Sequence, residues 1–444
     1  MENNKSLKRV LSLSGVTLFG LSFMAPATVF STYGIAVSAS GGMVASGYVI
    51  TLAIVLLSAI SYARLSKEFP VAGSTFSYVQ RIIGPKFGFL VGWTMLLDYL
   101  LSPMISSLLF GIMVNAYFPS ISISACILVF LVFIVAINII GIRITATYNM
   151  LIVIFQIVFI VLFSVLSAYE LIQGGGAGTL WSLKPFLDSS VSWGNLMTII
   201  PILYFSFLGF DAVTTLAEET VNPAKVLPKA IYIVVLSGGV LLVLAAYFMQ
   251  MIYPDFTSFT NPDAAAVQII QLVGGNLFGS LFLAMTITGA TASAASSCSS
   301  ASRMLFSMGR EGILPKRLFA YLHPKFSTPV WNIALIGLIG CSALFLDLTS
   351  ATHLISFGVL IGFGFVNLAV FMYFYIQKGL RGVSGFIVNL LVPLIGAVIT
   401  LALLFTLGQG ALLLGGGWLA AGFLYLLIRT KGFAEDTPQL VEEM

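Results

Sequence analysis

The sequence predicts an all-α polytopic membrane protein with twelve transmembrane helices, and three observations support this fold class. Of the 444 residues, 59% are hydrophobic and only 8% are charged, whereas a soluble domain carries roughly 25% charged residues. The apolar residues gather in runs of about 20, the length of a membrane-spanning helix. These runs lack the alternation with period two that a membrane β-barrel requires. The chain therefore has lipid as its solvent and is expected to cross it as helices.

Twelve apolar runs, each bounded by charged or turn residues, cover most of the chain. They lie at about residues 15–38, 43–65, 87–117, 121–141, 145–171, 195–217, 229–253, 275–308, 330–347, 350–376, 385–407 and 409–430. Residues 1–10 are charged and short, and the following run contains Pro26 without a small-residue cleavage site. We interpret it as a retained span and not as a signal peptide. No connection is long enough for a soluble domain, so residues 1–444 are expected to form one transmembrane domain.

The lysines and arginines predict the orientation of the spans. With the N-terminus in the cytoplasm and twelve crossings, 19 of the 20 basic residues fall on the cytoplasmic side, and only Lys184 falls outside. This asymmetry follows the positive-inside rule. We therefore expect a multi-pass protein of the cell (inner) membrane with both termini in the cytoplasm.

Other functional classes lack their motifs. There is no G-x-x-x-x-G-K-[ST] phosphate loop and no hydrolytic constellation, so we expect a transporter driven by a gradient and not an enzyme. Basic clusters with interleaved aromatics are missing, which argues against nucleic acid as a partner. The three cysteines and two histidines lack metal-ligand spacing, so neither a metal nor a cofactor is expected. The predicted partners are a small-molecule substrate, protons and lipid; the oligomeric state is not predicted.

Two carboxylates lie inside predicted spans, where polar groups are costly and therefore functional candidates. Asp98 is about twelve residues into the third span, roughly 18 Å along the helix, and Asp211 lies in the sixth span, with Glu218 and Glu219 at its cytoplasmic end. No lysine or arginine lies in the middle of a span. A buried field of negative sign suits a cationic substrate, and a desolvated carboxyl group also suits proton exchange near neutral pH.

Structural roles for these acidic residues remain open alternatives. Asp98 could stay protonated or join neighbouring helices by a hydrogen bond, and Asp211 could cap the second half of a broken helix. Glu218 and Glu219 precede the sequence Asn222-Pro223 and could be plain interfacial residues.

Two spans contain helix-breaking residues at corresponding places. Pro26 in the first span removes a backbone donor, and Gly209 in the sixth lowers helix stability. Unwound backbone at the membrane midplane persists only where it lines a cavity, and a matched pair of interrupted helices indicates an inverted repeat. We expect five-plus-five helices, with the first repeat at about 15–171, the second at about 195–376, and two extra helices at about 385–430. The small residues at 289–297 in the eighth span could serve close helix packing or form a cavity wall.

Several short motifs are spread along the chain, at residues 205–211, 218–223, 228–230, 302–310, 314–315, 323–325 and 328–329. They resemble motifs of the amino acid–polyamine–organocation permeases, and the resemblance covers nearly the whole chain. The resemblance implies a LeuT-like fold. Residues 28–30, 91–93, 97–101, 103–104 and 205–220 are further similar to the putrescine importer group, which implies proton-driven uptake. It also implies that Asp98, Tyr99 and either Glu218 or Glu219 take part in amine recognition or coupling.

Two positions depart from what the resemblance implies. Proton-coupled amino acid permeases of this superfamily can carry a lysine on the fifth span in place of a sodium ion, and the corresponding residue here is Gln156. Some putrescine importers have an aspartate where this chain has Ser31. A missing carboxylate leaves room for a monoamine, an amino acid or a different amine geometry. An amino acid would place its carboxylate on the half-helix N-termini and exposed N–H groups of the first and sixth spans.

We therefore expect proton-coupled import of a small cationic amine, with putrescine as the preferred substrate, by alternating access around the two broken helices. The alternative is an amino acid permease or an amino acid/amine exchanger of the same superfamily. The candidate substrate-binding residues are Ala25, Pro26, Ala27, Thr28, Ser31, Asp98, Tyr99, Tyr204, Phe207 and Gly209. The candidates for gating or proton coupling are Gln156, Phe210, Asp211, Glu218 and Glu219.

Overall fold

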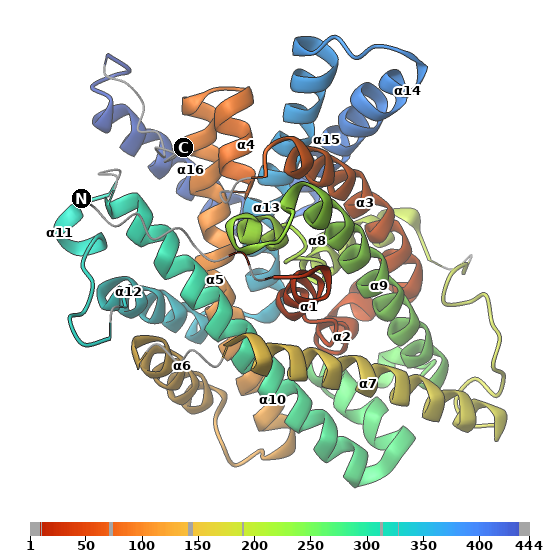
Figure 1. Cartoon of the computed structure of the whole chain (residues 1–444). Helices are drawn as coiled ribbons and strands as arrows, with labels where there is room; N and C mark the ends of the chain where they lie inside the picture. Colours follow the sequence, from red (N-terminus) through yellow and green to blue (C-terminus); the bar gives the residue numbers. More distant parts are fainter. Residues whose placement is uncertain are drawn as a thin grey trace.

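Helices form all the regular structure in the part of the chain that the computed structural model describes (Figure 1). The described residues are 9, 11–70, 74–140, 145–188, 191–310, 314–326 and 328–434. Within these ranges the only β-type pairing is an isolated bridge between Leu11 and Thr220. The all-helical prediction is confirmed.

The α-helices follow one another along the chain as α1 (Leu13–Met24), α2 (Thr28–Ser40), α3 (Val44–Glu68), α4 (Ser74–Ile82), α5 (Pro85–Tyr117), α6 (Ile123–Ile140), α7 (Thr145–Ile172), α8 (Trp193–Phe205), α9 (Pro223–Ile252), α10 (Ala265–Arg310), α11 (Lys316–Phe319), α12 (Val330–Gly340), α13 (Leu348–Val370), α14 (Val383–Gly385), α15 (Val392–Leu403) and α16 (Gln409–Arg429). The 3₁₀ segments are η1 (Ala212–Glu219), η2 (Phe256–Ser258), η3 (Pro262–Ala264), η4 (Cys341–Leu344) and η7 (Leu404–Thr406), and the π-helical segments are η5 (Phe371–Gln377) and η6 (Phe386–Leu391).

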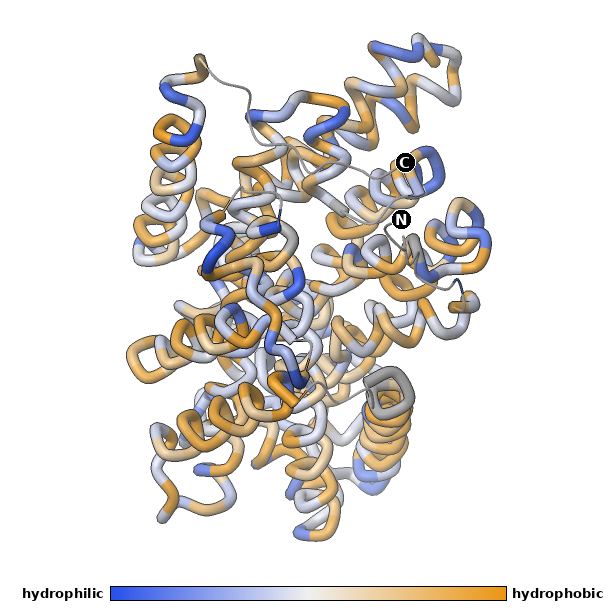
Figure 2. The backbone as a smooth tube through the Cα atoms, turned by 60° about the vertical axis from the view of Figure 1, so that its left-hand side comes forward, coloured by the Kyte–Doolittle hydropathy of each residue, from blue (hydrophilic) through white to orange (hydrophobic). Residues whose placement is uncertain are grey.

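Ten helical stretches of the described chain are long and apolar enough to cross a membrane. Two shorter apolar helices, Trp193–Phe205 and Val330–Leu344, lie where the sequence predicts the sixth and ninth spans. Figure 2 shows the hydrophobic residues along these helices and the hydrophilic ones mainly in the connections. The protein is therefore a multi-pass membrane protein.

Two details differ from the sequence prediction. The helix α4, which lies between the second and third predicted spans, was not predicted from the sequence. Its nine residues are too few to form an apolar run of membrane-spanning length. The helix α10 begins at Ala265, ten residues before the predicted span, and bends at Gly275, where φ is 64° and ψ is −162°. Glycine tolerates this positive φ without the steric cost that other residues meet.

Both predicted breaks are present. The helix α1 ends at Met24, Ala25 adopts a left-handed conformation (φ 45°, ψ 78°), and α2 begins at Thr28. The helix α8 ends at Phe205, and the chain turns through residues 206–211 into η1.

The two breaks lie against each other. Gly209 has φ +113°, and a Cβ atom at this position would lie 2.6 Å from the backbone nitrogen of Met24 and 2.8 Å from the Cβ atom of Phe23. Only glycine meets both demands, because it accepts positive φ and has no side chain. Gly209 therefore allows the broken segments of the first and sixth spans to meet.

The helix α5 lies at the centre of the packing, and its side chains are buried along most of its length. It packs against α4, α6, α10, α12, α13 and α16. The helices α1, α2 and α8 pack beside it against α3, α7, α9, α10 and α13. Side by side, α3 and α9 form a second extensive contact (Figure 1). This arrangement surrounds the two breaks with long helices.

Candidate substrate site

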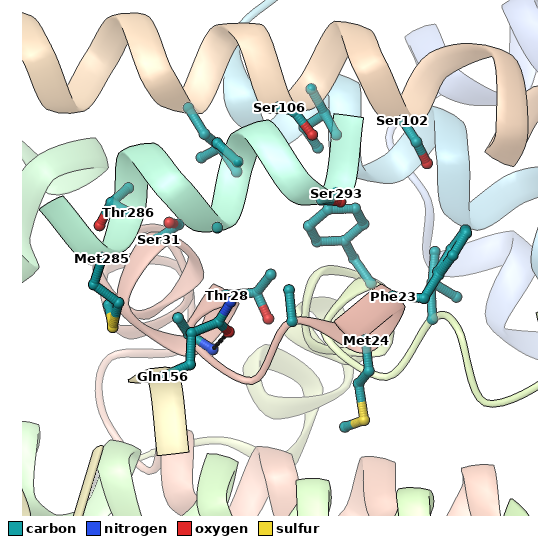
Figure 3. Close-up of a pocket in the computed structure, with 18 of the residues that line it drawn as sticks. Phe23, Met24, Thr28, Ser31, Ser102, Ser106, Gln156, Met285, Thr286 and Ser293 are labelled. Atoms are coloured by element: carbon teal, nitrogen blue, oxygen red, sulfur yellow. Dashed lines mark hydrogen bonds between the residues drawn. The ribbon is translucent and has the colours of Figure 1, made fainter. Parts of the chain in front are cut away.

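A cavity of about 70 Å³ lies between the α1–α2 break and the helices α5, α7 and α10 (Figure 3). Its polar lining residues are Thr28, Ser31, Asp98, Ser102, Ser106, Gln156, Thr286 and Ser293. The remaining lining residues are Phe23, Met24, Ala25, Ala27, Ile105, Leu109, Phe205, Leu208, Met285, Gly289 and Ala290. The cavity thus combines hydroxyl groups with apolar surface, as small-molecule sites commonly do.

Asp98 is the only charged side chain among the described residues that line this cavity. It lies on α5 and is 2% exposed. The Ser102 hydroxyl, one helical turn later, donates to its Oδ1 atom at 3.3 Å. A cavity with one carboxylate and neutral hydroxyl groups attracts cations and repels anions.

Gln156 connects three segments at one end of the cavity. Its Oε1 atom accepts a hydrogen bond from the Ala27 N–H at 3.2 Å, within the α1–α2 break. Its Nε2 atom would lie 3.1 Å from a Cβ atom on Gly289 of α10. The side chain is 1% exposed. The buried carboxamide of Gln156 therefore links α7 to the α1–α2 break.

Six of the residues predicted from the sequence line the cavity together. They are Ala25, Ala27, Thr28, Ser31, Asp98 and Gln156. The other predicted residues are not among the described residues of the lining. Pro26 lies within the break itself, and Tyr99 packs edge-on against Phe23, a wall residue, with ring centroids 6.1 Å apart.

The predicted aromatic residues of the sixth span pack into the protein interior. Tyr204 contacts Phe363 (6.0 Å between ring centroids), and Phe207 contacts Tyr48 (6.3 Å). Both Tyr204 and Phe207 are fully buried. Their ring contacts are with Phe363 and Tyr48, which are not among the described residues that line the cavity.

Phe210 belongs to a compact aromatic cluster with Tyr62 and Phe363. The ring centroids are 5.6 Å apart for Phe210 and Tyr62, 5.0 Å for Phe210 and Phe363, and 5.2 Å for Tyr62 and Phe363. All three side chains are fully buried. The cluster joins the segment after α8 to α3 and α13.

Asp211 is 2% exposed and lies next to this cluster. Its Oδ1 atom accepts from the Gly209 N–H at 3.3 Å, and its Oδ2 atom has no hydrogen-bond partner within the described part of the chain. Asp211 directly precedes η1, in the N-cap position, but its side chain forms no capping hydrogen bond there. The capping interpretation is therefore wrong, because the carboxylate turns back to the break.

Backbone hydrogen bonds fasten the beginning of α1 to the end of η1. The Leu11 N–H donates to the Glu219 carbonyl at 2.9 Å, and the Val221 N–H donates to the Leu11 carbonyl at 3.0 Å. Glu219 thus contributes through its main chain, while the side chain of Glu218 lies outside the described residues. We call the pairing of Leu11 with residues 219–221 the α1–η1 bridge.

A second close contact lies in the middle of α2. A Cβ atom on Gly34 of α2 would lie 1.9 Å from the Pro262 carbonyl oxygen of η3. The α1–α2 break therefore lies, along the chain, between the pairing of Leu11 with residues 219–221 and the contact of Gly34 with Pro262.

The sequence interpretation missed several lining residues on α5 and α10. Ser102, Ile105, Ser106 and Leu109 follow Asp98 at spacings of four, seven, eight and eleven, which places them on one helix face. The sequence spacing from Asp98 could therefore have identified these four residues as candidates for the same face of the helix. The wall of α10 comes from the small-residue segment, where Gly289 and neighbouring residues serve as cavity lining.

Comparison with known proteins gives consistent matches. A family model described as "Amino acid permease" matches residues 13–428. The low-affinity putrescine importer PlaP of Escherichia coli (strain K12) is 38% identical over 434 residues, which cover 98% of this chain and 96% of that protein. The branched-chain amino acid permease BcaP of Bacillus subtilis is 28% identical over 392 residues (82% and 81%), and the methylthioribose transporter of the same organism is 26% identical over 452 residues (96% and 95%). These relatives are transporters that match the chain over most of its length.

Proposed function

Because the chain belongs to the amino acid permease family, we propose that this permease imports a small cationic amine, with putrescine as the substrate. One observation carries the proposal: Asp98 is the only charged side chain among the described residues of the cavity wall. An ammonium group placed beside it gains a charge-assisted hydrogen bond. The hydroxyl groups of Ser102 and Ser106 then offer neutral acceptors for the rest of the amine. The 38% identity to a putrescine importer supports the same substrate.

We propose alternating access around the two breaks, with the twelve-span, five-plus-five arrangement expected from the sequence. The first repeat would cover about 15–171, the second about 195–376, and the two extra helices about 385–430, all within one transmembrane domain. The short helices α8 and α12 would complete the twelve crossings. In this topology the protein lies in the inner membrane with both termini in the cytoplasm, and the α1–η1 bridge is on the cytoplasmic side.

A proton gradient is the proposed energy source, and Asp211 is the proposed proton carrier. Its Oδ2 atom is buried without a partner, and an ionised oxygen in this situation is costly. The aromatic cluster around Phe210 would close the path beside Asp211.

The test is uptake of labelled putrescine into proteoliposomes with an inward proton gradient, repeated with an uncoupler. We expect saturable accumulation that the uncoupler abolishes. Uptake that saturates but does not respond to the gradient would refute proton coupling while leaving the amine substrate in place. Accumulation of neutral amino acids without any putrescine uptake would refute the proposed substrate and favour the amino acid permease alternative.

A further inference from the structure

The N-terminus of α2 is the natural place for a substrate carboxylate in an interrupted helix. Free backbone N–H groups and the helix dipole make such an end an anion site. In this protein these donors are already engaged. Pro26 has no N–H group, the Ala27 N–H donates to Gln156, and the Thr28 N–H donates to the Ala25 carbonyl at 2.8 Å. The Val29 N–H donates to the Pro26 carbonyl at 3.4 Å.

The second break is closed in the same manner. The Gly209 N–H donates to the Asp211 carboxylate at 3.3 Å. The preceding N–H groups of Phe207 and Leu208 donate to the carbonyls of Tyr204 (3.0 Å) and Phe205 (3.2 Å). The Asp211 carboxylate therefore engages the Gly209 N–H, so that this donor within the second break is also not free for a substrate carboxylate.

We propose that Gln156 is a specificity-determining residue that excludes substrates bearing a carboxylate. Its Oε1 atom accepts the hydrogen bond of the Ala27 N–H. Among the N–H groups at the α2 N-terminus, this is the one that does not donate to a neighbouring main-chain carbonyl. An incoming carboxylate would have to displace this carboxamide from a buried position and would also face Asp98 across the same cavity. Either cost alone disfavours an anion.

This inference rests on the proposed function and narrows its substrate class. The site takes amines without an α-carboxylate and rejects the diamino acids of the same chain length. Putrescine and ornithine share a four-carbon spacing between their amino groups and differ by one carboxylate, so the protein distinguishes the product of a decarboxylation from its precursor.

The first experiment uses the unmodified protein. Uptake of labelled putrescine into proteoliposomes is measured against two competitors, ornithine and ornithinamide, in which a neutral amide replaces the carboxylate at nearly the same volume. We expect half inhibition to require at least about a tenfold higher concentration of ornithine than of ornithinamide. The ornithine carboxylate loses hydrogen bonds with water and finds the Ala27 N–H already engaged, and one lost hydrogen bond to a charged group accounts for this factor. Equal inhibition would overturn the exclusion, because bulk alone would then explain the result.

The second experiment isolates Gln156. The variant Gln156→Leu keeps the volume and frees the Ala27 N–H, whereas Gln156→Glu keeps an acceptor for it. We expect the ratio of the ornithine inhibition constant to the putrescine KM to fall about tenfold in Q156L and to stay high in Q156E. A role in folding alone would lower activity toward both amines without changing this ratio, and an unchanged ratio in an active Q156L would overturn the assignment.

The outcomes separate the inference from the proposed function. Putrescine uptake that ornithine and ornithinamide inhibit equally would refute the exclusion of carboxylates by Gln156 and would still support import of an amine. Uptake of ornithine without uptake of putrescine would refute both the exclusion and the proposed substrate. Should Q156L fail to fold, the comparison of ornithine with ornithinamide on the unmodified protein still decides whether the site excludes carboxylates.

Discussion

Replacing Asp98 by asparagine tests the central contact of the proposed site. Asparagine has nearly the same shape, and its side-chain oxygen still accepts from the Ser102 hydroxyl, which lies 3.3 Å from Oδ1 in the present structure. The substitution therefore removes the charge and leaves the packing of this 2% exposed side chain in place. We expect folding to be unaffected and amine binding to be lost.

The size of the effect follows from the burial of the carboxylate. Removing one partner of a buried, hydrogen-bonded charge pair costs about 2–5 kcal/mol. At about 1.4 kcal/mol per tenfold change, the putrescine KM of D98N should rise by a factor of about 30 or more. The matched control is Ser102→Ala, which keeps the carboxylate and removes a single hydrogen bond worth about 0.5–1.5 kcal/mol. Its KM should rise by no more than about tenfold.

The assay is initial-rate uptake of labelled putrescine in proteoliposomes over a range of concentrations, with the thermal unfolding temperature of each variant measured in detergent. An unfolding temperature close to that of the unmodified protein, together with a high KM, supports the contact. A correctly folded D98N protein with an unchanged KM would refute the reasoning, because the ammonium group would then bind elsewhere.

Three further substitutions test the surroundings of the site. Gly209→Ala should destabilise the protein by about 1–3 kcal/mol through the positive φ and abolish uptake, whereas Gly410→Ala, with nothing within 4 Å of its Cβ position, should leave the unfolding temperature unchanged. Leu11→Pro removes the N–H group that donates to the Glu219 carbonyl, and it should increase thiol labelling of a cysteine introduced at Ser106. The control Leu11→Ala keeps both hydrogen bonds of the α1–η1 bridge. Equal labelling of the two variants would contradict a role of the bridge in limiting access to the cavity. Trp418→Phe removes the indole N–H that donates to the Trp93 carbonyl at 2.8 Å and should lower the unfolding free energy by about 1–3 kcal/mol, measured by denaturant titration; a value near zero would show that α5 and α16 do not depend on this bond.

The sequence was most informative where one residue type dictates local structure. Pro26 and Gly209 predicted the two breaks, since each disrupts a helix by its own backbone chemistry. Asp98 was recognisable because a carboxylate is costly in the middle of a span, and the structure places it at the cavity wall. By contrast, Tyr99 was paired with Asp98 by resemblance, although adjacent residues of a helix do not share a face.

Other features depend on tertiary contacts that no local pattern records. Ala25 adopts a left-handed conformation although it has a side chain, and this follows from the packing around the break. Tyr204 and Phe207 lie at the end of α8 and in the turn after it, where the direction of a side chain cannot be read from helical periodicity, and both face the interior. The bond between Gln156 and Ala27 joins residues 129 positions apart.

The α1–η1 bridge lowers the population of states in which α1 and η1 are separated. Separation of Leu11 from residues 219–221 breaks two backbone hydrogen bonds, at a net cost of about 0.5–1.5 kcal/mol each. Their sum, about 1–3 kcal/mol, lowers the population of a separated state by a factor of about 5 to 150. A movement that keeps the bridge intact avoids this cost, and it must then carry α1 and η1 together, because Gly209 and Met24 also hold these segments against each other at the break. The helix α1 and the segment from Gly209 to Val221 are thus joined at two places and are expected to move together as one unit.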